Sequence, residues 1–523
     1  MGGAVADNEG GLAVWEWGSV LAAAVLALAL GFAKLEAPSL WHDELVHAFV
    51  GKSIAETGQA ELPSGVPYYS GTAINVILAG VIKFWGMSEA ALRTPSVLIA
   101  GVNVVLTFFV LRPLLGPATA VIAAFAMALC PWTVAWSREA RFYTLQQCLY
   151  LVTILAFWRL SEAVGARKAA GAAVVCVAAY ILSILTSFHS ILFLGGIGAY
   201  AIFMGLRQRR LKSRWTVLVA GIGGAGILSL AGLALLMNNL DREAVLDRGG
   251  LGGQIVDLGR AHRLYYTHWL RLNLSNGFFA MAMFGFAAMA IKEGRRGLYA
   301  ALAFWAPIVI LTFLIGYRRP RFMFFVFPFY VAASSYAMVV LAEWLRRPKP
   351  DRNHRFGFWM HRAAAALVLV FAIRLAWSGV LLVGDSLDTA SGAHLTLARR
   401  HPQWKEPCAY VKEHREDAVV VTTTYLPVLY YVGHVDNWYP SHDVWWEVDE
   451  SGMAGLDRLE DFQRFVAEHP KGFFIAEWSR FERNVADVPW SDFSEDIAWV
   501  QANLTRIEEA STKDVSLYAW GFD

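Results

Sequence analysis

The chain has 523 residues, of which 56% are hydrophobic and 17% are charged, and its mean hydropathy is +0.42. These values exclude an ordinary soluble protein and indicate a chain that crosses a membrane several times. The formal net charge of +2 is too small to suggest nucleic-acid binding. The cysteines are scattered along the chain, which argues against a disulfide framework.

Long apolar segments predict a polytopic α-helical membrane protein. The first, at 13–34, lacks a basic stretch before it and a cleavage site after it, so we expect a retained span. A spanning helix needs about 20 mostly apolar residues, and with the first span such segments give about eleven. The others lie at 95–112, 118–136, 143–160, 168–186, 189–206, 215–238, 273–291, 298–316, 321–345 and 360–384.

The apolar segment 72–85 is short for a span and suits a helix that lies along the membrane interface or re-enters it. The basic loops are near 159–168, 207–214, 292–296 and 346–355, and the predicted spans place all of them on one side. The positive-inside rule makes that side cytoplasmic, together with the N-terminus. If 72–85 crossed the membrane, the later loops would invert or the N-terminus would be outside, so this point stays open.

Two domains are predicted: a membrane domain at 1–384, with a first outer loop at 35–94, and a soluble extracytoplasmic α/β domain at 385–523. The boundary follows a change to charged sequence with turn signals. Within the second domain we expect helices at 408–414 and 459–468 and strands at 418–422, 429–432, 472–477 and 515–520.

The motif WHDE, at 41–44, places Asp43 and Glu44 outside, directly after the first span. The same side carries arginines close to the membrane, where cations are depleted and tend to be kept for function. Guanidinium groups bind phosphate oxygens through paired hydrogen bonds, so an anionic ligand is attractive; anionic lipid headgroups are the alternative. These arginines are Arg138, Arg141, Arg318, Arg319 and Arg321.

Other readings of the acid pair were weighed. Acids at a helix N-terminus compensate the helix dipole, which by itself would explain Asp43 and Glu44. The histidines of a zinc metalloprotease are four residues apart, whereas His42 and His47 are five apart. A looser divalent-metal site using Glu44 and His47 remains possible, and the identity of any metal is unknown.

A family resemblance rests on several motifs in order. After the first span come WHDE at 41–44, PYY at 67–69, ALRTPS at 91–96 and SREARFY at 137–143. This order resembles bacterial relatives of the protein O-mannosyltransferases and the lipid A aminoarabinose transferases, which are membrane glycosyltransferases of the GT-C fold. The resemblance covers about residues 13–345, and the tail from Tyr410 is similar to domains appended to some of these enzymes.

The resemblance implies transfer of a sugar from a polyprenyl-phosphate donor in the cell membrane to an acceptor hydroxyl on protein, lipid or glycan. The reaction would be a single displacement that inverts configuration on the extracytoplasmic face. Asp43 would be the general base, and Glu44 would orient the acceptor or share that role. A phosphate leaving group needs no proton, so one carboxylate and several cations suffice.

The remaining site residues follow from the same resemblance. Arg138 and Arg141 match an arginine-bearing segment and would hold the donor phosphate. Arg321, in RPRFMFFVFP, resembles the opening of a late span and would join them, and His189 is a further phosphate contact. Three tyrosines would stack on sugar or line the lipid groove: Tyr68, Tyr69 and Tyr143.

The acceptor class stays open because Gln146 and Gln147 stand where protein mannosyltransferases carry an aspartate. A transporter or flippase for lipid-linked saccharide is the alternative function. It predicts ionisable groups at mid-membrane and two related halves, whereas here such residues cluster at one face. A binding or scaffold protein that acts through its tail tryptophans is a third reading.

Overall fold

The structure is a computed structural model that describes residues 12–207, 214–239, 264–314, 319–346, 402–439, 451–477 and 494–522. The chain divides into two compact units. The helical unit comprises Met1–Ala33, Ser96–Ser137 and Phe142–Ser391, and the mixed unit comprises Lys34–Pro95, Arg138–Arg141 and Gly392–Asp523. The mixed unit therefore joins the predicted first outer loop and residues 138–141 to the C-terminal region.

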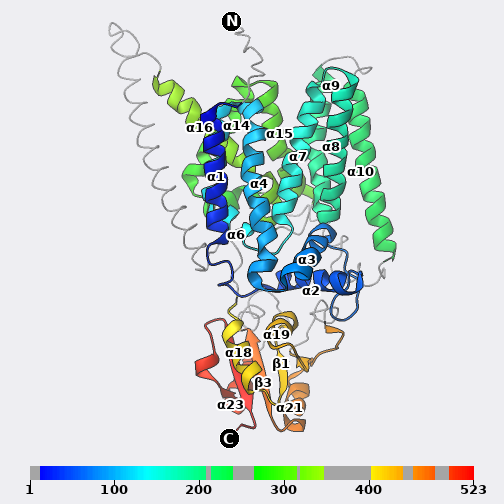
Figure 1. The fold of residues 1–523 in the computed structure, drawn as a ribbon, viewed down its shortest axis with the longest axis vertical. Helices are drawn as coiled ribbons and strands as arrows, with labels where there is room; N and C mark the ends of the chain where they lie inside the picture. The colour runs from blue at the N-terminus through cyan, green and yellow to red at the C-terminus, as the bar shows by residue number, and fades with distance from the viewer. Residues whose placement is uncertain are drawn as a thin grey trace. The chain divides into compact units, whose positions relative to one another are not determined.

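The helical unit is built from long helices (Figure 1). Its first half contains α1 (Val14–Phe32), α4 (Glu89–Leu115, whose first turns belong to the mixed unit), α5 (Pro117–Leu129), α6 (Pro131–Ser137), α7 (Tyr143–Glu162), α8 (Ala166–Thr186), η1 (Phe188–Leu192), α9 (Phe193–Arg207) and α10 (Arg214–Asn239). Its second half contains α13 (Tyr265–Asn273), α14 (Asn276–Lys292), α15 (Arg295–Leu314), η2 (Pro320–Val326) and α16 (Phe327–Arg346).

Helix packing in this unit follows from small residues and breaks. A Cβ on Gly285 would lie 1.8 Å from the Ala333 carbonyl oxygen, so this glycine lets α14 and α16 approach closely. The axes of α5 and α6 differ by 60° where Pro131 follows Cys130, because proline lacks the N–H that would continue the helix. The helix α7 packs on α8, and α9 packs on α10 and α15.

Six helices in the described residues are long and apolar enough to cross a membrane, or up to seven if the bent pair α5–α6 counts as one span. Shorter apolar helices include α3 and α14. Described segments at the predicted spans from 13–34 to 321–345 are helical, whereas 360–384 lies outside the described residues. Large apolar side chains such as Leu21, Val174 and Ile181 are more than half exposed, which suits contact with lipid.

The mixed unit begins with α2 (His42–Thr57) and α3 (Thr72–Trp85), which pack together. Its C-terminal part contains α18 (Lys405–His414), β1 (Val419–Thr422), α19 (Tyr425–Val432), β2 (Asn437–Trp438), α21 (Leu459–Glu468), β3 (Gly472–Glu477), α23 (Ser494–Asn503), β4 (Thr505–Arg506), η3 (Glu508–Ala510) and β5 (Val515–Trp520). The α/β character predicted for this region is confirmed.

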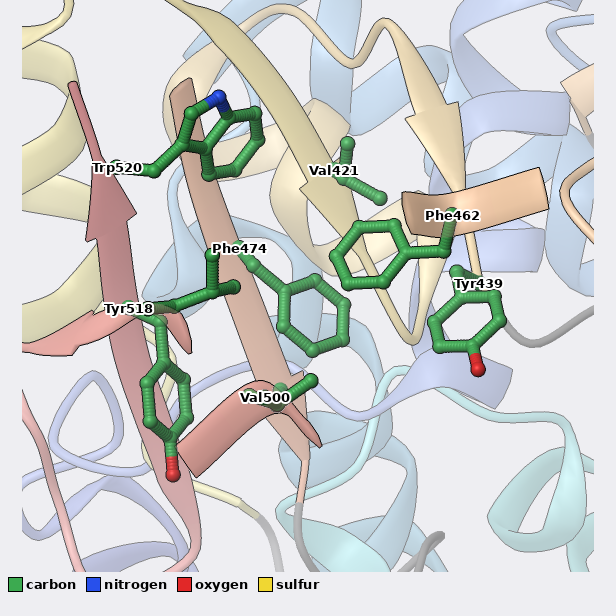
Figure 2. Close-up of a cluster of buried hydrophobic side chains, with 9 residues drawn as sticks. Val421, Tyr439, Phe462, Phe474, Val500, Tyr518 and Trp520 are labelled. Atoms are coloured by element: carbon green, nitrogen blue, oxygen red, sulfur yellow. The ribbon is translucent and has the colours of Figure 1, made fainter. Parts of the chain in front are cut away.

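The sheet has the order β2-β1-β3-β5-β4. The strand β1 is parallel to β2 and β3, and β5 is antiparallel to β3 and β4. Apolar and aromatic side chains from strands and helices form its core (Figure 2), where Phe462 stacks on Tyr439 with 4.5 Å between ring centroids. Phe474, from β3, contacts the same Phe462 ring.

One predicted element is wrong: residues 429–432 belong to the helix α19 and not to a strand. An apolar run this short has no periodicity that separates the two. The missed signal is Gly433, whose φ of 88° forms a left-handed cap at the helix C-terminus.

Candidate active site

The carboxylate of Glu44 is fully buried near the start of α2. Its Oε2 accepts hydrogen bonds from the Trp41 N–H at 2.8 Å and from Arg93 Nη2 at 2.9 Å. Its Oε1 accepts from Arg93 Nε at 2.9 Å and from the Ala140 N–H at 2.8 Å. A carboxylate offers about four lone-pair positions, so these contacts fill its capacity.

Arg93 is the partner that the sequence interpretation left out of its set of arginines. It is 1% exposed, and its guanidinium donates to Glu44 and to backbone carbonyls. The carbonyl acceptors belong to Leu35 at 3.0 Å, Pro38 at 2.8 Å and Ser39 at 3.0 Å. The segment 35–39 therefore wraps around one side chain, and a buried charge is matched on all sides.

Asp43 faces a different environment from its neighbour. Successive helical residues point about 100° apart, so burial of Glu44 turns Asp43 away from that pocket. The side chain of Asp43 is 25% exposed and forms an ion pair with Arg141, whose side chain is 9% exposed. The structure thus brings the predicted base and one predicted phosphate-binding arginine together.

Arg138 lies in the same unit, and its Nη2 donates to the Lys34 carbonyl at 3.1 Å. Burial and the charge of Arg93 lower the pKa of Arg138 to about 10, so it remains protonated at neutral pH. Two guanidinium groups that raise each other's energy in a partly dry region favour an added anion. The predicted residues Asp43, Glu44, Arg138 and Arg141 therefore belong to one cluster, to which Arg93 is added.

His47 has a structural environment. It is 1% exposed, and its Nδ1 lies 2.7 Å from Asn75 Oδ1, which ties α2 to α3. Burial lowers the pKa of His47 to about 4. Gly71, with φ of 69°, packs on the ring so closely that a Cβ would lie 2.6 Å from it. Among the described residues no group of three or more His, Cys, Asp or Glu side chains is arranged to hold a metal ion.

The tyrosines of the PYY segment differ in exposure. The ring of Tyr68 meets His47 edge to face at a centroid distance of 6.0 Å, whereas Tyr69 is 51% exposed. Tyr143, in the helical unit, is 2% exposed and packs on Trp136 at 4.6 Å. Burial leaves Tyr143 little surface for a sugar, and Tyr69 offers the most.

A second charged cluster lies on η1 and η2 of the helical unit. The His189 ring stacks on Phe322 at 4.1 Å, and the guanidinium carbon of Arg321 lies 5.8 Å from the centroid of the same ring. The structure therefore brings His189 and Arg321 together, as the predicted phosphate clamp requires. Arg319 is exposed, and Arg318 lies outside the described residues.

The two glutamines hold these turns in place. Gln146 Nε2 donates to Ser190 Oγ at 3.2 Å on η1, and Gln147 Nε2 donates to the Phe324 carbonyl at 2.7 Å on η2. Both amides are buried at the start of α7. The residues that replace a family aspartate thus have a positioning role.

An apolar cavity of about 620 Å³ lies beside η1 within the helical unit. It follows one face of α8 from Ala173 to Leu185 and reaches Phe188, the residue before His189. The remaining lining comes from α7, α9 and α10, and the Tyr180 hydroxyl lies 2.9 Å from Ser229 Oγ inside it. Its size and lining suit a hydrocarbon chain.

Comparison with known proteins agrees with this architecture. The sequence model of the family described as dolichyl-phosphate-mannose-protein mannosyltransferase matches residues 72–230. None of the curated proteins gives a significant match. ArnT from Cupriavidus metallidurans bound to undecaprenyl phosphate is similar, with a TM-score of 0.65 and 13% identity over 97% of this chain and 98% of that one.

A second similar structure is the archaeal oligosaccharyltransferase AglB from Archaeoglobus fulgidus, in complex with an inhibitory peptide and a dolichol-phosphate. Its TM-score is 0.58 and its identity 14%, over 94% of this chain and 72% of that one. With the apolar helices and the C-terminal sheet, these likenesses confirm the predicted fold class: the chain has the GT-C fold of membrane glycosyltransferases.

Proposed function

We propose that the protein transfers a sugar from a polyprenyl-phosphate-linked donor to an acceptor hydroxyl on the extracytoplasmic face of the cell membrane. The observation that carries this proposal is the cluster at α2, where a partly exposed carboxylate, Asp43, lies against Arg141 on a buried ion-pair frame. One accessible base beside guanidinium groups is the equipment that displacement of a sugar phosphate requires.

In the proposed step, Asp43 accepts the proton of the acceptor hydroxyl as its oxygen bonds to the anomeric carbon. The bond between that carbon and the phosphate oxygen breaks, and its electron pair leaves with the polyprenyl phosphate, so configuration inverts. Glu44, saturated with hydrogen bonds and fully buried, is better suited to positioning Asp43 than to sharing the base role.

Arg138 and Arg141 are proposed to stabilise the growing negative charge on the phosphate. His189 and Arg321 are proposed as further phosphate contacts, supported by their meeting on one aromatic ring. Tyr69 is the tyrosine best exposed for a sugar, and Tyr68 has a smaller role in this assignment.

The lipid part of the donor is supported by the apolar cavity beside η1. The solved relatives were captured with undecaprenyl phosphate and with a dolichol-phosphate, which are polyprenyl phosphates. The proposed sidedness, with the N-terminus cytoplasmic and the C-terminal region outside, rests on the distribution of basic loops.

Radiolabelled transfer tests the proposal. Purified protein in lipid nanodiscs would be given polyprenyl-phosphate-[14C]hexose and envelope extract from the source organism, with labelled nucleotide sugar as the control donor. We expect label on an acceptor from the lipid donor alone, and its loss in Asp43→Asn. Lipid-donor movement across liposomes without any transfer would favour the flippase reading and overturn this one.

A further inference from the structure

The C-terminal region of the mixed unit holds the segment that precedes α2. Trp404, buried at the start of α18, donates its N–H to Ser39 Oγ at 2.9 Å. Lys405 forms an ion pair with Glu89 at 2.9 Å and donates to the Glu36 carbonyl. Residues more than 300 positions apart in sequence therefore meet within one compact unit.

Tyr431, on α19, makes the most informative of these contacts. Its hydroxyl accepts the Leu40 N–H at 2.8 Å and lies 3.2 Å from Glu89 Oε1, to which it donates. One hydroxyl thus acts as acceptor and donor at once, which requires that it stay protonated. Burial and the Glu89 carboxylate raise the pKa of Tyr431, which keeps it so.

These contacts continue to the acid pair through named hydrogen bonds. Leu40 is fully buried next to Ser39, whose carbonyl accepts from Arg93. Arg93 in turn holds both oxygens of Glu44. Because Glu44 also accepts the Trp41 N–H, the first turn of α2, which bears Asp43, is fixed by the same set of bonds.

We propose that Tyr431 is a positioning residue of the active site: its hydroxyl fixes Leu40 and thereby the turn that presents Asp43. The C-terminal region is on this account a part of the catalytic framework and not an appended module. The proposal deepens the proposed function and rests on it for its catalytic consequence, whereas the structural tie is independent of the reaction.

The test compares Tyr431→Phe with the neighbouring Tyr430→Phe in the full-length protein in nanodiscs. Tyr430 is a matched control because it lies on the same helix and its hydroxyl donates to the Met87 carbonyl, away from Leu40. Each variant is assayed for kcat, for the Kd and stoichiometry of polyprenyl phosphate binding, and for hydrogen exchange of peptides covering 35–44.

For Tyr431→Phe we expect kcat to fall by at least about tenfold, because small misplacements of a reacting group are costly. Binding stoichiometry and Kd should stay within about twofold of wild type, which shows that the variant is folded and separates positioning from general instability. Exchange at 35–44 should accelerate in Tyr431→Phe and not in Tyr430→Phe.

Equal exchange and equal kcat in Tyr431→Phe and wild type would overturn the proposal, as would identical behaviour of the two variants. If wild-type protein transfers no sugar at all, the proposed function fails. In that case accelerated exchange confined to Tyr431→Phe still supports the tie, and unchanged exchange refutes it.

Discussion

Two charged clusters in the described part of the chain are built by different means. At α2, Arg93 is surrounded by a carboxylate and backbone carbonyls, so its N–H donors are consumed by the protein. On η1 and η2, His189 and Arg321 rest against the ring of Phe322. A ring contact uses no N–H donor, so it leaves a cation able to bind an anion.

The difference separates framework from ligand contact. Arg93 and Glu44 form a rigid support and gain nothing from a substrate. Arg321, His189 and the partly exposed Asp43 keep polar atoms for chemistry. Charge in a membrane protein is therefore a poor guide to function until its partners are known.

The largest expected effect is loss of the framework. Arg93→Met leaves Glu44 as a buried charge, which should lower the free energy of unfolding by about 3–5 kcal/mol. Denaturant unfolding in detergent measures this. Arg112→Met is the control, because Arg112 pairs with Glu16 at 2.7 Å but keeps its side chain 32% exposed. Equal losses in the two variants would contradict the framework role of Arg93.

The next effect is a dependence of stability on pH. Folding lowers the pKa of His47 from 6.5 to about 4, so between these values the unfolded chain binds a proton that the folded chain does not. Stability should therefore fall as the pH drops from 6.5 toward 4, by at most about 3 kcal/mol. Unfolding midpoints across this range, with His47→Gln as reference, measure it; parallel curves for the two proteins would refute it.

A smaller effect is expected at the second cluster. Arg321→Ala removes a charged donor to phosphate, worth about 1.5–3 kcal/mol, so the Kd for polyprenyl phosphate should rise about 10- to 100-fold. Titration of the lipid phosphate into nanodiscs gives this value. Arg319→Ala should bind nearly as wild type does because Arg319 is exposed; an unchanged Kd in Arg321→Ala would remove it from the clamp.

The smallest effect concerns the ring between the cations. Phe322→Leu keeps apolar volume but removes the stack under His189 and the face next to Arg321. A contact of this kind is worth about 0.5–1 kcal/mol, which corresponds to a two- to fivefold weaker Kd. No weakening would mean that the ring only fills space.

The sequence was sufficient for the helices, because hydrophobic runs of spanning length leave few alternatives in the chain. It was also sufficient to group Asp43 with Arg141, through the expectation that charges near a membrane find partners. The helix at 425–432 was missed because a short apolar run is ambiguous and the glycine after it was not weighed.

The roles of the two acids were not separable from the sequence. Asp43 and Glu44 are adjacent and chemically alike, and only the direction of each side chain decides which is buried. Arg93 was within reach, since it sits in the quoted motif ALRTPS at the start of an apolar helix. The contacts of Tyr431 were not, because they join residues about 390 positions apart.

The central claim is that Asp43 is the base and Glu44 its support. Single-turnover transfer in nanodiscs saturated with radiolabelled donor tests it most directly, with Asp43→Asn compared with wild type. We expect a rate lower by about 10²- to 10⁴-fold with donor Kd nearly unchanged. A variant that transfers sugar at the wild-type rate would contradict the claim.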